Sequence, residues 1–152
     1  ADPCRCRGRA DRDGERRMSD ATIDIRLILG PLSPAETWHV GAAGAVVTFD
    51  GVVRPSESDG VIEALDYEVY EPMTGREMQR LARDVRDAFG LIGIRVDHSV
   101  GRVAVGQISF RLRIAAAHRR AAIDATDSFI ARMKRDVPIW KNPVWRKREE
   151  TK

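Results

Sequence analysis

Two stretches of helical spacing, each followed by a stop signal, divide an otherwise strand-like chain and constrain its fold most strongly. Apolar side chains recur three or four positions apart across residues 72–89, and Gly90 follows where a helix commonly ends. A second such pattern covers about residues 118–135, and Val137-Pro138 breaks it. The expected buried side of this second helix consists of Ala122, Ile123, Phe129, Ile130 and Met133.

The remaining chain reads mainly as strands. Alternating or β-branched runs predict strands at residues 22–29, 44–54 and 61–70, further strands punctuated by Gly101 and Gly106 across 92–117, and an extended segment at 139–145. The polar segment 55–60 is expected to be a mobile loop. Strands interrupted by helices, without internal repeats, predict an α+β fold rather than a doubly wound one.

One more short helix is expected between the first two strands. Ser33 is placed to cap it, Pro34 suits the first helical position, and Glu36 completes a capping box. This helix would span about residues 33–44 and brings the expected order to β-α-β-β-α-β-β-α-β.

The charge of the chain is concentrated at its ends. The chain carries 26 Lys and Arg against 23 Asp and Glu, for a net charge of +3. Residues 1–17 contribute +2, residues 134–152 contribute +4, and the part between them is slightly acidic. No aromatic RNA-binding signature or helix-turn-helix pattern accompanies the basic ends, so nucleic acid is not an expected partner. No apolar run approaches the roughly 18 residues of a membrane span, and the cytoplasm is the expected location.

Residues 1–17 are expected to form a disordered extension, because they contain almost no apolar side chain to bury. Met18 reads as a plausible true start, with residues 18–152 as one domain. Both cysteines, Cys4 and Cys6, lie in the extension. A C-x-C pair without further ligands is a weak metal signal, so no metal site is expected.

The cations most informative about function are few. All four lysines lie in the last nineteen residues, among them Lys134 near the end of the second long helix and Lys141 beyond Pro138. A favourable helix dipole explains Lys134 but not Lys141, and a merely basic C-terminal tail remains an alternative for both. His118 and Arg119 open the same helix, where free N–H groups favour an anion, although a capping histidine and a solvated arginine would serve equally well.

Five segments occur together in an order that resembles one family. They are GAVVTFDGVVR, LDYEVYEPM, VGRVAVG, AAAHRRAA and MKRDVPIWK, and the resemblance covers roughly residues 20–145. The chain is similar in these segments to the MoaE family, the large catalytic subunits of molybdopterin synthase.

The resemblance implies a fold, a reaction and partners. The expected fold is an α/β hammerhead with an additional small antiparallel β subdomain. The expected reaction transfers sulfur from the C-terminal thiocarboxylate of a small ubiquitin-like, MoaD-type subunit to cyclic pyranopterin monophosphate, which yields the molybdopterin dithiolene. The resemblance implies a homodimer of this chain within a heterotetramer, and a reaction that needs no metal or other cofactor. The alternative is a non-catalytic docking module for a ubiquitin-like tail.

The resemblance also implies the residues of a site. Lys134 and Lys141 are the expected catalytic residues, because they would polarise the reacting centre and stabilise negative charge. The expected substrate-binding residues are Val52, Val53, Arg54, His118, Arg119, Lys134, Lys141 and Asn142.

The chain departs from the family pattern in three places. His98-Ser99 stands where many relatives have His-Arg, and Asn142-Pro143 replaces a basic and an acidic residue. A tail arginine that family members provide to the neighbouring subunit corresponds to Arg146 or Arg148, without a decisive alignment. These departures concern substrate affinity rather than the class of reaction.

Overall fold

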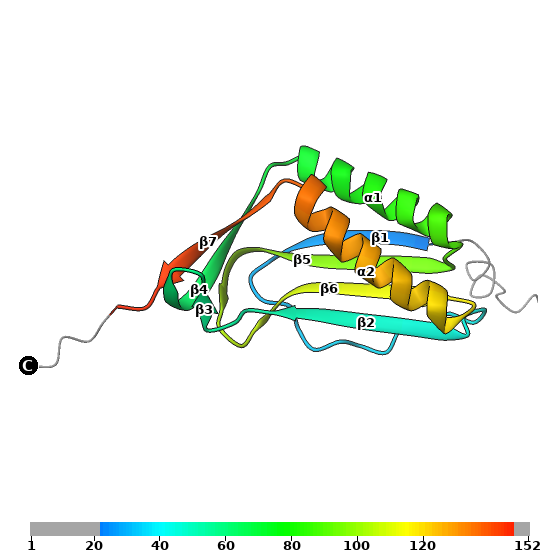
Figure 1. The fold of residues 1–152 in the computed structure, drawn as a ribbon, viewed down its shortest axis with the longest axis horizontal. Helices are drawn as coiled ribbons and strands as arrows, with labels where there is room; N and C mark the ends of the chain where they lie inside the picture. The colour runs from blue at the N-terminus through cyan, green and yellow to red at the C-terminus, as the bar shows by residue number, and fades with distance from the viewer. Residues whose placement is uncertain (1–21, 148–152) are drawn as a thin grey trace, which may run out of the picture.

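The computed structural model describes residues 22–147, which form one seven-stranded sheet and two helices (Figure 1). The elements are β1 (Thr22–Leu29), β2 (Ala45–Val52), β3 (Ser56–Glu57), β4 (Gly60–Val69), α1 (Met73–Phe89), β5 (Gly93–Ala104), β6 (Ile108–Ala116), α2 (Arg119–Asp136) and β7 (Ile139–Trp145). The expected disordered extension, with Cys4 and Cys6, lies outside the described residues, as does Arg148.

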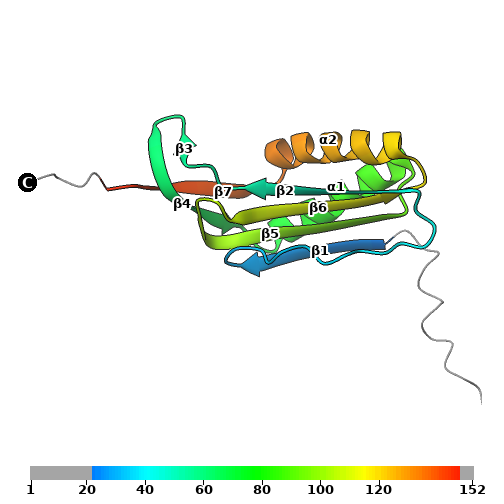
Figure 2. The same ribbon diagram turned by 90° about the horizontal axis from the view of Figure 1, so that it is seen from below.

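The long strand β5 organises the sheet. Its first part pairs antiparallel with β6, which in turn pairs with β2, while β1 runs parallel to β5 along the opposite edge. Beyond that point β4 replaces β1 on this edge of β5, and β7 and β3 pair with β4. The β3-β4-β7 part therefore extends from one end of the main sheet, as Figure 2 shows.

Both helices cover the same face of the main sheet. Leu81 and Val85 of α1 and Phe129 of α2 are buried in one cluster with Ile94 of β5 and Leu112 of β6. Since buried apolar area is the main driving force of folding, this layer of side chains fixes the helices on the sheet. The β3-β4-β7 part of the sheet has a second, smaller buried cluster, which consists of Val53, Ile62, Leu65, Tyr67 and Val103.

The expected α+β class is confirmed, and the separate cluster in the β3-β4-β7 part fits the expected additional small antiparallel β subdomain.

Both long helices end where the sequence predicts. Gly90 adopts the left-handed conformation, with φ 62° and ψ 44°, and its N–H binds the carbonyl of Arg86. Helix α2 begins after the extended His118 and ends before Val137, one residue short of Pro138. Among residues 22–147, no helix is both long and apolar enough to span a membrane.

Three local predictions are wrong, wholly or in part. Residues 33–44 do not form a helix, because the carbonyl groups that its first turn would use accept hydrogen bonds from β6 instead. Arg111 Nη1 donates to the Ser33 carbonyl at 2.8 Å, and Arg113 Nη1 donates to that of Glu36 at 3.3 Å. The polar segment 55–60 is not wholly a loop, since Ser56 and Glu57 pair with the start of β4. Ile123, expected on the buried side of α2, is 55% exposed.

Candidate functional site

A cavity of about 630 Å³ lies where the C-terminal end of α2 meets the end of β2 and the β3-β4-β7 extension. This volume is in the range of sites for small organic ligands. The lining residues that matter here are Val52, Val53, Arg54, Glu57, Tyr67, His98, Ser109, Phe110, Lys134 and Lys141.

Lys134 and Lys141 reach this cavity from opposite sides of the Pro138 break. Lys134 lies in the last turn of α2. The chain then changes from helix to strand, and β7 pairs with β4 so that Lys141 lies opposite Tyr67. The side chain of Lys134 makes no hydrogen bond or ion pair within the described part of the chain. Lys141 Nζ donates to Glu57 Oε1 at 3.0 Å. The break explains how residues seven positions apart line one cavity.

The end of β2 forms a second wall. The β2–β6 register shifts between Gly51 and Val52, which leaves Ser109 of β6 without a partner position on β2. Val53 is only 3% exposed and is held by backbone hydrogen bonds to Gln107 and Gly106. Arg54 follows as an exposed cation without a hydrogen bond or ion pair within residues 22–147. A fixed backbone therefore carries a guanidinium that remains available to a ligand.

Aromatic side chains and a buried histidine line the deeper part of the cavity. His98 packs edge-on against Tyr67, with 5.2 Å between the ring centroids, and against Phe110 at 5.7 Å. Its Nδ1 donates to the Ser99 carbonyl at 2.8 Å, which fixes the neutral tautomer. Burial lowers the pKa of His98, and this backbone hydrogen bond offsets only part of the effect. Tyr67 and Ser109 are joined by a hydrogen bond of 2.9 Å.

The remaining predicted site residues do not line this cavity. His118 and Arg119 are at the other end of α2, and fifteen residues of helix separate Arg119 from Lys134 by about 22 Å. Asn142 lies on β7 opposite Asp66, away from the cavity lining. Arg146 follows β7, where its N–H binds the Val61 carbonyl. The structure thus groups Val52, Val53, Arg54, Lys134 and Lys141, and leaves the others apart within one chain.

The lining is cationic. Arg54, Lys134 and Lys141 face Glu57 and Asp50, and Asp50 is already paired with Arg111, at 2.6 Å from Nε. Arg111 therefore compensates one of the two carboxylates from outside the cavity, and the net field favours an anion. Sequence reasoning did not select Glu57, Tyr67, His98 or Ser109. His98 enters the sequence analysis only as part of a departure from the family pattern, and its spacing with Ile94 and Val96 on β5 is a further signal that it faces the apolar side of the strand.

The α+β sheet with two helices on one face, and the cationic, partly apolar cavity at the end of the second helix, place the chain in the class of α+β proteins whose cavity suits a small organic anion. The comparison with protein families gives the specific member of this class. Residues 28–136 match the family model described as MoaE protein, and the chain belongs to this family.

Named relatives agree with this assignment. The chain is 37% identical over 105 residues to the molybdopterin synthase catalytic subunit of Nostoc sp., covering 68% of this chain and 64% of that protein. It is 40% identical over 123 residues to the protein of the same name from Coccidioides immitis, covering 78% of this chain and 62% of the relative. The chain therefore spans slightly less than two thirds of the length of these two relatives.

Solved structures share the fold. Molybdopterin synthase from Staphylococcus aureus matches with a TM-score of 0.70 and 26% identity, over 80% of this chain and 90% of that one. In a complex of subunits 1 and 2 of the molybdopterin-converting factor from Helicobacter pylori, one chain matches with a TM-score of 0.62 and 23% identity, over 82% of this chain and 91% of that one. The second likeness concerns the fold alone.

Proposed function

We propose that this chain is the catalytic subunit of a molybdopterin synthase, which transfers sulfur from the C-terminal thiocarboxylate of a small ubiquitin-like, MoaD-type subunit to cyclic pyranopterin monophosphate. The observation that carries the proposal is the placement of Lys134 and Lys141 on one cationic cavity in a chain of the MoaE family. The names of the relatives support the same reaction.

The chemistry of the transfer explains the need for cations. The thiocarboxylate sulfur forms a bond to a substrate carbon while a carbon–oxygen bond at that carbon breaks and the oxygen leaves with the electron pair. Water then cleaves the bond between this sulfur and the acyl carbon of the partner, whose terminus leaves as a carboxylate. Each carrier brings one sulfur, so a dithiolene requires two rounds. Negative charge develops on oxygen in each round, and the ammonium groups of Lys134 and Lys141 are positioned to stabilise it.

Arg54 is the proposed ligand of the substrate phosphate. Its planar guanidinium suits a bidentate contact with phosphate oxygens, and it stands at the rim of the cavity without a competing carboxylate bound to it. The aromatic wall of Tyr67 and Phe110 gives a surface for the planar pterin ring system. Asn142 of β7, outside the cavity lining, is also a proposed substrate contact.

His118 and Arg119 are proposed to contribute to the site of the second copy in a homodimer. A pterin monophosphate is much shorter than the 22 Å or so that separates Arg119 from Lys134 along α2. A twofold axis that places α2 antiparallel to α2 of a second copy would bring Arg119 of the partner toward Lys134, in each of two equal sites. Exposed apolar residues on this edge, Val46 and Val52 of β2 and Ile123 of α2, favour such an interface.

The proposed location is the cytoplasm, because a reducing compartment keeps a thiocarboxylate from being oxidised. The purified chain, mixed with a thiocarboxylated small subunit and cyclic pyranopterin monophosphate, is expected to form the dithiolene. Binding of the small subunit without any product would instead support the non-catalytic docking module.

A further inference from the structure

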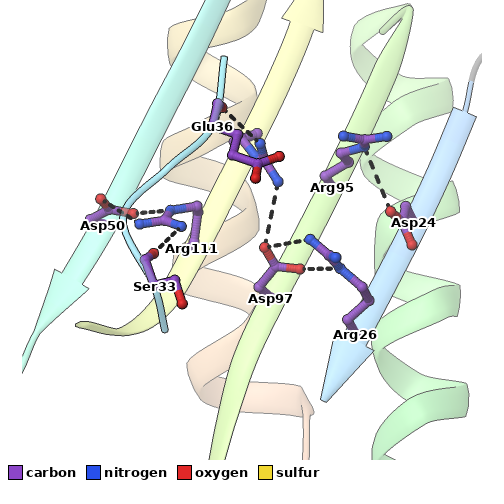
Figure 3. Close-up of polar contacts among 9 residues, drawn as sticks. Asp24, Arg26, Ser33, Glu36, Asp50, Arg95, Asp97 and Arg111 are labelled. Carbon is purple, nitrogen blue, oxygen red and sulfur yellow. Dashed lines mark hydrogen bonds and ion pairs between the residues drawn. The ribbon is translucent and has the colours of Figure 1, made fainter. Parts of the chain in front are cut away.

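A second cavity, of about 310 Å³, lies on the face of the sheet that the helices leave uncovered. Side chains of β5 and β6 alternate, so that Ile94 and Leu112 face the helices while Arg95 and Arg111 face this cavity. The loop after β1 passes beside Arg111 of β6, as Figure 3 shows for Ser33 and Glu36. Four arginines line the cavity, together with only two carboxylates, Glu36 and Asp97.

Two of these arginines are fully engaged. Arg26 donates from Nε and Nη2 to both oxygens of Asp97, at 2.7 and 3.1 Å. Arg111 makes the same bidentate contact with Asp50, at 2.6 and 3.1 Å, and also donates to the Ser33 carbonyl (Figure 3). Bidentate pairs of this kind satisfy the guanidinium group well. Asp97 is therefore already paired with Arg26, and Asp50 with Arg111.

The other two, Arg95 and Arg113, are gathered over one indole ring and lack such partners. Their guanidinium carbons lie 5.0 and 6.0 Å from the centroid of Trp38. The Nε atoms of both are buried and have no hydrogen-bond acceptor within residues 22–147. A carboxylate oxygen of Asp24 lies 3.6 Å from Arg95 Nε, and one of Asp97 lies 3.5 Å from Arg113 Nη2. Unsatisfied buried donors of this kind are uncommon and call for an explanation.

Arg113 is the more buried of these two arginines. Its side chain is only 7% exposed, and the carboxylate nearest to it, Asp97, is already bound by Arg26. Burial lowers the pKa of Arg113, Asp97 opposes this effect, and the neighbouring Arg95, Arg111 and Arg26 lower the pKa further. A buried cation with a shared counter-ion would be stabilised by an anion that enters the cavity.

The position of Trp38 is itself built into the fold. Its ring lies on Gly93 at the start of β5, where an added Cβ would come within 3.0 Å of two ring carbons. Because Gly93 has no Cβ, the ring can approach the strand here while its face is presented to two guanidinium groups. Two like charges are held together here by the fold rather than dispersed.

We infer that this cavity is a binding site for a single phosphate-type oxyanion, free or as a monophosphate ester, which accepts hydrogen bonds from Arg95 and Arg113. The site is distinct from the lysine cavity, because it lies on the opposite face of the sheet, and it does not depend on the proposed sulfur transfer. Glu36 and Asp97 in the lining disfavour polyanions. The volume exceeds that of phosphate alone and leaves room for the organic part of a small ester.

The test is a titration of the full chain with inorganic phosphate at constant ionic strength, with chloride as the reference anion, followed through the ¹H–¹⁵N signals of the arginine Nε–H groups. The Arg95 and Arg113 signals are expected to shift with phosphate but not with chloride. Arg95→Met should weaken phosphate binding roughly ten- to a hundredfold, as expected when a charge-assisted contact is lost. Arg83→Met, at an exposed site on α1, is the matched control and should bind as the wild type does.

Two further variants separate this site from the alternatives. Glu36→Gln removes a carboxylate of the lining and should tighten phosphate binding by about threefold, a sign opposite to that of Arg95→Met. The double variant Lys134→Ala/Lys141→Ala should retain the response of Arg95 and Arg113. A glycerol phosphate arm that binds more tightly than inorganic phosphate assigns a monophosphate ester, and equal affinity assigns the free anion.

Two results would overturn the inference. One is an absence of phosphate-specific shifts at both Nε–H groups in the folded wild-type chain. The other is a response that disappears in the double lysine variant, which would place the phosphate in the lysine cavity. Since Arg113→Met removes a buried side chain and is open to folding effects, the partly exposed Arg95 carries the test.

Discussion

Lys141 donates a hydrogen bond to Glu57 across 3.0 Å, and this contact joins β7 to the two-residue strand β3 at the edge of the cationic cavity. The lysine side chain is 54% exposed and that of the glutamate 20% exposed. An ion pair with this much solvent contact contributes at most about 1 kcal/mol, so it can open when a stronger anion arrives. Glu57 therefore occupies Lys141 in the absence of substrate.

Glu57→Gln is expected to raise the affinity for the pterin substrate by up to about fivefold, because the substrate no longer competes with a carboxylate for Lys141. The measurement is a direct binding titration with cyclic pyranopterin monophosphate. Glu63→Gln is the control, since Glu63 forms a similar exposed pair with Arg102 at 2.6 Å and does not line the cavity. Weaker binding by Glu57→Gln would show that Glu57 contacts the substrate instead.

The homodimer proposed for His118 and Arg119 makes a quantitative prediction. Arg119→Ala and Lys134→Ala should each be nearly inactive alone, because each dimer then has two defective sites. Random mixing of the two variants should restore about one quarter of wild-type activity, since half of the dimers gain one intact site. The measurement is dithiolene formation after co-expression and after separate expression.

The same experiment has a clear opposite result. If Arg119 and Lys134 of one chain act on the same substrate, no mixed dimer contains an intact site and co-expression restores nothing. Wild-type activity of Arg119→Ala alone would remove Arg119 from the site. Arg120→Ala provides the control, because Arg120 is its neighbour on α2 and is paired with Asp124 at 2.9 Å.

His98 is expected to make the folded state less stable in acid. Because burial lowers its pKa below the ordinary value of about 6.5, the unfolded chain binds more protons once the pH falls below that value. The contribution of His98 to stability is therefore present at higher pH and is lost as the pH falls through about 6.5 toward the lower pKa of the folded state. Urea unfolding of wild type and His98→Gln from about pH 8 to about pH 5 measures this effect. The stability difference between them should narrow in acid, and a constant difference would contradict the account.

Much of the local structure is predictable because its cause is local. Gly90 ends α1 through its own backbone freedom, and Pro138 ends α2 because it has no N–H to donate. The failed helix at residues 33–44 shows the limit. Ser33, Pro34 and Glu36 give a sound capping pattern, but a helix of this length is marginal alone. Contacts from Arg111 and Arg113, more than seventy residues away, determine the conformation instead.

The candidate site likewise has features with a local cause, which the sequence predicts, and features that depend on long-range pairing, which it does not. Residue type and position single out Lys134 and Lys141, the family resemblance adds Arg54, and the structure brings all three to one cavity. Glu57 was not selected, because only the pairing of β3 and β7 with β4 brings it to Lys141. The separation of Arg119 from Lys134 follows directly from helix geometry. No sequence spacing, however, indicates which surface a second copy would cover.

The sulfur-transfer account is tested most directly by Lys134→Ala, assayed for both pterin binding and dithiolene formation with a thiocarboxylated small subunit. Product formation should fall by roughly a hundredfold or more, as when one group that stabilises transition-state charge is removed, while pterin affinity changes by less than about tenfold. Arg135→Ala, at the exposed neighbouring residue paired with Asp136, should remain close to wild type. Product formation by Lys134→Ala at the wild-type rate would contradict the account.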